Sequence, residues 1–168
     1  MKPVKTAGFS LIEVLVALIV VSIGLLGIAK IQALAYSSTS TASERSIASL
    51  QAASLGAAMR ANRGYWAAGA APSPLTISGT TISDTGLAGN TTSCANSPCT
   101  SVNMAAYDLH QWAAAVVAVL PNPVTTIVCG SIPVNCTITM TWDEKTVAVN
   151  QQGTGATQGP SYTLFVEP

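Results

Sequence analysis

The feature that most constrains this chain is an uninterrupted apolar segment near its amino terminus, residues 9–29. About 20 apolar residues at 1.5 Å each match a hydrocarbon core of roughly 30 Å, so the segment predicts a membrane-spanning helix. Glu13 lies about one turn inside it, where a lone carboxylate costs at least roughly 2.5 to 3.5 kcal/mol on insertion scales. The segment contains no Lys or Arg. We therefore expect the counter-charge of Glu13 to come from the headgroup zone, from another chain or from a new amino terminus beside it.

A short basic leader precedes the apolar segment and ends in small residues. Gly8 stands directly before Phe9, so cleavage after Gly8 would leave a free amine one helical turn from Glu13. A secretory signal peptide would instead carry its cleavage site after the apolar segment, where residues 33–35 offer a weak small-residue site. The leader therefore favours cleavage at its own end.

Residues 5–14, Lys-Thr-Ala-Gly-Phe-Ser-Leu-Ile-Glu-Val, resemble the class III leader of type IV prepilins. In that family, prepilin peptidase cuts after the glycine and N-methylates the residue that follows. The resemblance assigns these roles to Gly8 and Phe9. It also matches Glu13 to the family's acidic residue, which pairs with the terminal amine of a neighbouring subunit in the filament.

The helical pattern continues past the membrane segment. No proline occurs from Lys30 to Asn62 and strong helix formers dominate, so a helix over residues 9–62 would be about 80 Å long, its first half projecting from the globular part. The Ser/Thr run at residues 37–41 competes for backbone hydrogen bonds and leaves a bend there open. Apolar residues at near-helical spacing predict one packing face, made of Ile31, Leu34, Ala35, Ile47, Leu50, Ala53, Ala57 and Met59.

Composition separates a membrane part from a soluble part. A hydrophobic fraction of 49% with 8% charged residues is typical of a membrane protein, yet the apolar run lies before Lys30. The rest is rich in Ala, Ser, Thr, Gly and Asn, as in a charge-poor soluble domain. We predict a leader at 1–8, a transmembrane half-helix at 9–29, an outer half-helix at 30–63 and a globular head at 64–168.

The sequence predicts an α+β fold, with a long helix packed on a small antiparallel sheet and an additional short helix. The resemblance to type IV prepilins implies that this is the type IV pilin fold. A long irregular connection with one short strand (75–82) leads to a helix over 104–120 that Pro121 ends. The expected apolar face of that helix is Leu109, Trp112, Val116, Val119 and Leu120. Residues 137–142 alternate polar and apolar, typical of a sheet with one wet face. The expected strands are 124–129, 136–142, 146–150 and 161–166.

Net charge argues against a nucleic-acid partner. The formal net charge is zero, and removing Lys2 and Lys5 leaves five basic and seven acidic side chains, about minus two. Phosphate binding needs a clustered basic face. Arg60 and Arg63 are the only close basic pair, and arginines at a helix end more often interact with the helix dipole.

Four cysteines lie beyond the membrane segment. An even count in an oxidising exterior predicts two disulfides, with three possible connectivities. The short separations favour Cys94 with Cys99 and Cys129 with Cys136. Zinc sites usually space their ligands as C-x2-C or H-x3-H, and His110 is the one histidine, so we expect no metal and no cofactor.

The sequence contains few residues that could indicate a catalytic site. Asp108 and His110 fall on the predicted second helix, but the chain offers no recognisable triad or metal constellation. A membrane-anchored enzyme or sensor would need one, so we expect a protein that is not an enzyme. Residues 90–92 formally match a glycosylation sequon, for which chance is the default.

Further residues resemble the PilV family of type IV pilus minor pilins: residues 22–29, 42–45, 108–112 and the strand at 161–166. That resemblance implies a low-abundance subunit that joins other minor pilins and the major pilin in an initiating or tip complex. The inner-membrane assembly machinery would load it, and the pilus would serve adhesion or twitching motility. Before assembly the amino terminus would be cytoplasmic, by the positive-inside tendency, and the head periplasmic; afterwards the subunit would lie in the extracellular pilus.

The alternative is a type II secretion minor pseudopilin, which shares the leader, Glu13 and the long helix. The length of the chain and the disulfide-bearing head favour the PilV family.

Overall fold

A computed structural model of the chain describes residues 8–144 and 159–168. The chain forms two compact units that divide between Ser40 and Thr41. The α+β fold class is confirmed, with a long amino-terminal helix that carries an apolar span, a small antiparallel sheet and short helices. Leader residues 1–7 and the strand predicted at 146–150 lie outside the described residues.

The long helix, α1 (Leu11–Ala61), is unbroken through the Ser/Thr run at residues 37–41. Thr39 Oγ1 donates to the carbonyl oxygen of Ala35 at 2.9 Å, four residues back. Ser46 Oγ donates to Ala42 O in the same way at 3.0 Å. These hydroxyls are satisfied inside the helix, so they do not interrupt it.

The packing face predicted for α1 is largely wrong. Met59 is buried as expected, but Leu50 is 69% exposed, and Ala53 and Ala57 are exposed as well. Alanine is a strong helix former and occurs on every side of this helix, so it cannot mark the buried side. The buried residues are Ala48, Ala52, Leu55, Gly56 and Met59.

Among the described residues, five antiparallel strands form one sheet in the order β2-β1-β3-β4-β5. The strand predicted at 75–82 is in fact a hairpin, because Gly79 turns the chain with a φ of 59°, which glycine adopts at least cost. The strands are β1 (Leu75–Ser78), β2 (Thr81–Ile82), β3 (Val124–Cys129), β4 (Cys136–Thr141) and β5 (Ser161–Val166).

In the described part of the chain, three further helices accompany the sheet: α2 (Arg63–Trp66), α3 (Thr85–Ala88) and α4 (Ser101–Val117). The last begins three residues before its predicted start, because the Thr100 side chain accepts a hydrogen bond from Asn103 N at 3.3 Å and caps the helix. The other two have four residues each and lie in the connection predicted to be irregular. A single turn is too short to show periodicity.

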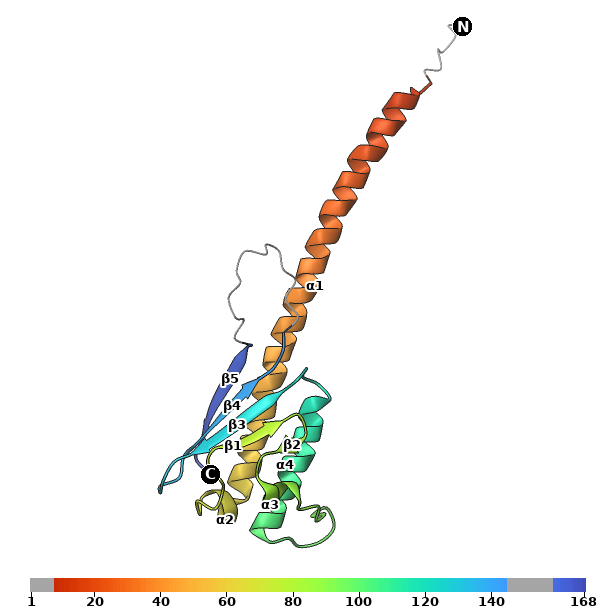
Figure 1. Ribbon diagram of the computed structural model, residues 1–168. Coiled ribbons are helices and arrows are strands. Elements are labelled where there is room, and N and C mark those ends of the chain that lie inside the picture. The colour runs from red at the N-terminus through yellow and green to blue at the C-terminus, as the bar shows by residue number, and fades with distance from the viewer. Residues whose placement is uncertain (1–7, 145–158) are drawn as a thin grey trace, which may run out of the picture. The chain divides into compact units, whose positions relative to one another are not determined.

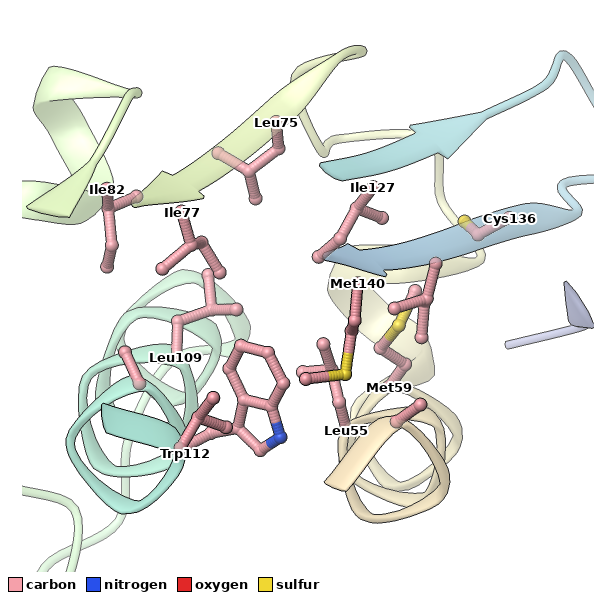
Figure 2. Close-up of a cluster of buried hydrophobic side chains, with 14 of the residues drawn as sticks. Leu55, Met59, Leu75, Ile77, Ile82, Leu109, Trp112, Ile127, Cys136 and Met140 are labelled. Atoms are coloured by element: carbon pink, nitrogen blue, oxygen red, sulfur yellow. The ribbon is translucent and has the colours of Figure 1, made fainter. Parts of the chain in front are cut away.

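The core fills the space between the sheet and two helical segments. Figure 2 shows side chains of β1, β3 and β4 facing Leu109 and Trp112 of α4 and Leu55 and Met59 of α1. On β4 the buried side chains alternate with partly exposed threonines, which confirms the wet face. The predicted face of α4 is buried except at Val119, which is 44% exposed; Val119 and the buried Leu120 both lie beyond the end of α4.

Hydrogen bonds join α4 to the part of α1 that belongs to the head. Trp112 Nε1 donates to Gln51 O of α1 at 2.9 Å, and Nδ2 of Asn62, the residue that follows α1, donates to Ser101 O at 2.7 Å. Figure 1 shows α4 and this part of α1 behind the strands. These bonds fix the position of α4 along α1.

Gly56 lets α1 approach the edge strand β5. A Cβ built on Gly56 would lie 3.1 Å from Val166 Cγ2 and 3.4 Å from Leu164 Cδ2. Contacts this short leave no room for a larger side chain, since protein interiors are close-packed.

Two disulfides are present, joining Cys94 to Cys99 and Cys129 to Cys136. The first closes the loop before α4. The second links register partners on β3 and β4, whose Cα atoms are 4.0 Å apart. It therefore holds the two ends of the β3–β4 turn together.

Replacing Gly56 by Leu should lower the free energy of unfolding of the head by about 1 to 3 kcal/mol, because the new side chain would force β5 away from α1. Ala53→Leu is the matched control on an exposed side of the same helix, and we expect a change within about 0.5 kcal/mol. Denaturant unfolding of the detergent-solubilised protein, followed by near-UV circular dichroism, measures both. Equal losses in the two variants would contradict the packing described here.

Non-reducing peptide mapping of the purified protein should recover the two local disulfides. Replacing Cys94 and Cys99 by Ser should cost about 2 kcal/mol of stability or less, because closing so short a loop removes little chain entropy from the unfolded state. Free thiols, or a crosslink from either of these cysteines to Cys129 or Cys136, would show that the pairing is different.

Candidate processing and assembly site

Gly8 and Phe9 form an open junction before the long helix. Among the described residues, nothing lies within 4 Å of a Cβ built on Gly8, and Phe9 is 83% exposed. The packing of the described residues therefore does not require glycine at this position. A requirement for glycine would arise in the active site of an enzyme that cuts here.

Glu13 lies in the first turn of α1, where its own backbone N–H donates to Ser10 O at 3.0 Å. The exposed N–H groups of a first turn favour a nearby carboxylate by about 0.3 to 1 kcal/mol. That is less than the roughly 2.5 to 3.5 kcal/mol that a membrane charge costs. The helix start thus offsets only part of the cost of Glu13.

The start of α1 is a feature that the sequence predictions missed, since they began the helix at Phe9. Ser10 and Glu13 have the Ser-x-x-Glu spacing of a capping box, a signal that locates a helix start. In the structure, the carbonyl oxygen of Ser10 accepts from Glu13 N and from Val14 N. The Ser-x-x-Glu pattern would have placed the helix start correctly at Leu11.

The first part of α1 presents an apolar surface on all sides. Each of the fourteen large apolar side chains from Phe9 to Ile28 is at least 49% exposed. By length and composition, α1 can cross a membrane, with a mean hydropathy of 2.8 over its most apolar window. Gly24 and Gly27 lie within this part, where a Cβ would meet nothing within 4 Å among the described residues. The surface needs lipid or another helix to cover it.

The other candidate residues do not form a second site of this kind. His110 Nε2 lies 3.1 Å from Leu87 O, and burial raises the pKa of the Asp108 carboxyl. Within residues 8–144 and 159–168, no three His, Cys, Asp or Glu side chains gather closely enough to hold a metal ion. Arg60 and Arg63 line two surface cavities, and Glu167 lines both. A carboxylate in each cavity weakens its attraction for phosphate.

Residues 4–29 match the model of the prokaryotic N-terminal methylation motif. The match spans Gly8, Phe9, Glu13 and the apolar segment that follows. Neither the curated proteins nor the solved structures contain a match to the chain. The motif belongs to structural proteins, and it implies processing by prepilin peptidase and membrane association of the amino-terminal helix. Together with the long apolar helix and the small sheet, it supports a type IV pilin-like protein, either a pilin or a pseudopilin.

Proposed function

We propose that the protein is a minor pilin of the type IV pilus, of the PilV family. It joins other minor pilins and the major pilin in an initiating or tip complex that primes pilus assembly and supports adhesion or twitching motility. The observation that carries this proposal is the position of Glu13, one turn beyond the Gly8–Phe9 junction and at the start of a helix whose apolar surface is uncovered.

Energetics explain why a carboxylate at this position suits assembly. The helix start offsets at most about 1 kcal/mol of the cost of Glu13, which leaves about 2 kcal/mol uncompensated in the membrane. An amine created at Phe9 is a suitable partner, and an ion pair is stronger in an apolar setting than in water. A neighbouring subunit that supplies such an amine would gain this energy on docking. The pair would also fix the axial register between the two helices.

The organisation of the head fits this role. Among the described residues, the core takes its α1 side chains from Ile47 onward, and the large apolar side chains from Phe9 to Ile28 are exposed. In this proposal, lipid or neighbouring subunits cover that exposed surface. We propose that residues 9–29 cross the inner membrane with a cytoplasmic amino terminus and a periplasmic head, and that the assembled subunit lies in the extracellular pilus.

A type II secretion minor pseudopilin is the alternative, because the matched motif is common to both kinds of protein. The two are distinguished by where the mature chain accumulates. A pilin copurifies with sheared pili, whereas loss of a pseudopilin impairs protein secretion and leaves pili intact.

We expect the mature protein to begin at N-methylated Phe9. Gly8→Val should leave uncut precursor in the membrane, because a branched side chain would crowd the bond that the peptidase attacks. Lys5→Gln, which lies outside that bond, is the control and should still be cut. Intact-mass analysis of protein from pili or membranes gives the answer. A mature chain that starts at Met1 or near Tyr36 would refute processing at this junction.

Glu13→Leu should reduce incorporation of the subunit into sheared pili by about tenfold or more, as expected for a loss of about 2 kcal/mol. Cleavage at Gly8, the head fold and both disulfides should be unaffected, because no residue of the head core is changed. Ser22→Leu is the matched control, because it also replaces a polar side chain of the span by leucine. The Ser22 hydroxyl donates to Leu18 O of the same helix at 2.7 Å. We expect the Ser22→Leu variant to be incorporated normally.

The measurement is quantitative mass spectrometry of sheared pili from a strain that lacks the native copy. Normal incorporation of Glu13→Leu would show that the carboxylate is tolerated in the span and has no role in assembly.

A further inference from the structure

A surface cavity of about 330 Å³ lies between the loop that follows α3 and one side of α4. Each of its lining side chains can form hydrogen bonds. None of them is an Asp, Glu, Lys or Arg. The lining residues are Asn90, Thr91, Thr92, Ser93, Tyr107, His110 and Gln111.

The loop side of the cavity is held in place by its own hydrogen bonds. Asn90 Nδ2 donates to Asn103 Oδ1 at 2.9 Å, and Thr92 N donates to Asn90 Oδ1 at 3.1 Å. The disulfide between Cys94 and Cys99 closes the chain directly afterwards. Because both ends of the Asn90 amide are already bonded, the sequon at this position is poorly suited to carry a glycan. The amide instead orders the loop.

The helix side presents three side chains from one face of α4. Tyr107, His110 and Gln111 have the i, i+3, i+4 spacing that places residues side by side on a helix. His110 Nε2 lies 3.1 Å from Leu87 O. A carbonyl oxygen can only accept, so in the neutral ring this nitrogen carries the proton and Nδ1 is an acceptor. The α4 face therefore offers an aromatic ring, an amide and an oriented imidazole.

We propose that this cavity binds a neutral pyranose sugar. Sugar hydroxyls both donate and accept, which matches the threonine, serine and glutamine groups of the lining. The face of a pyranose ring is apolar and can stack on the half-buried ring of Tyr107. The lining holds no Arg or Lys to attract an anionic ligand, and a purely apolar ligand would leave its polar groups without hydrogen bonds. The volume lies at the lower end for small-molecule pockets, as expected for one or two sugar units.

If the protein supports adhesion, a neutral sugar is the class of ligand that this cavity would bind. The use of the cavity in adhesion rests on the proposed function, whereas sugar binding itself does not. Binding by the purified protein does not depend on incorporation into a pilus. A failure to bind sugar would leave the minor-pilin proposal standing, and a failure to assemble would leave the sugar site standing.

The test uses the full-length protein in lipid nanodiscs, which avoids detergents with sugar headgroups. Saturation-transfer NMR would be recorded with D-glucose, D-galactose, D-mannose, L-rhamnose and N-acetyl-D-glucosamine, and with sialic acid as an anionic comparison. We expect saturation transfer to at least one neutral sugar. Gln111→Ala should weaken its binding about fivefold, the effect of one lost hydrogen bond. Tyr107→Ala should weaken it at least as much, and Tyr107→Phe should weaken it less than Tyr107→Ala, since the ring is retained.

Thr163→Val, on the exposed face of β5 and outside the cavity lining, is the control and should bind normally. Gln111 is exposed on α4 and alanine favours helix, so Gln111→Ala should fold normally. The test therefore stays decisive even if Tyr107→Ala unfolds. Three results would overturn the proposal: no saturation transfer to any neutral sugar, tighter binding of sialic acid than of every neutral sugar, or unchanged binding in Gln111→Ala.

Discussion

The apolar surface on the first part of α1 is the constraint on which the rest of the account depends. Fourteen large side chains between Phe9 and Ile28 are each at least 49% exposed, and removing them from water is worth on the order of 20 kcal/mol. Lipid tails and neighbouring apolar helices cover such a surface about equally well. Apolar area alone therefore holds the chain in a membrane without favouring a filament. The bias toward a filament has to come from a polar group, and Glu13 is the acidic residue inside this surface.

The head is stabilised separately from that surface. Ala48, Ala52 and Gly56 are buried where the later part of α1 packs on the head. Trp112 bonds α4 to this part of α1 at Gln51 O, and Asn62, the residue after α1, bonds to Ser101 O at the start of α4. One helix thus serves two environments, with small residues where it packs on the head and large aliphatic residues where lipid or neighbouring subunits cover it. This division predicts that a change at the start of α1 leaves the head fold intact.

Sequence patterns predicted those features that depend on strong, local chemistry. The apolar span, the wet face of β4 and the bounds of β3 and β5 follow from composition and alternation, and the structure agrees. The packing face of α1 could not be read, because burial there favours small residues and alanine occurs on every side. The turn between β1 and β2 depends on one dihedral angle, the φ of Gly79. The start of α4 depends on one hydrogen bond, from Asn103 N to the Thr100 side chain. Hydrophobic periodicity does not report such details. The polar cavity beside α4 is lined by residues from two separate segments of the chain, so it could be recognised only once the fold was known.

The most direct test of the account replaces Leu11, which is 90% exposed and next to the Ser10 helix start, with a photo-reactive amino acid. Cells would be irradiated, pili sheared, and the crosslinked peptides identified by mass spectrometry. If Glu13 docks against the amine of a neighbouring subunit, the crosslinked peptide is the amino-terminal segment of another processed pilin. Crosslinks only to lipid or to membrane proteins that are not pilins, with none in the sheared fraction, would contradict the claim that this helix assembles into a filament.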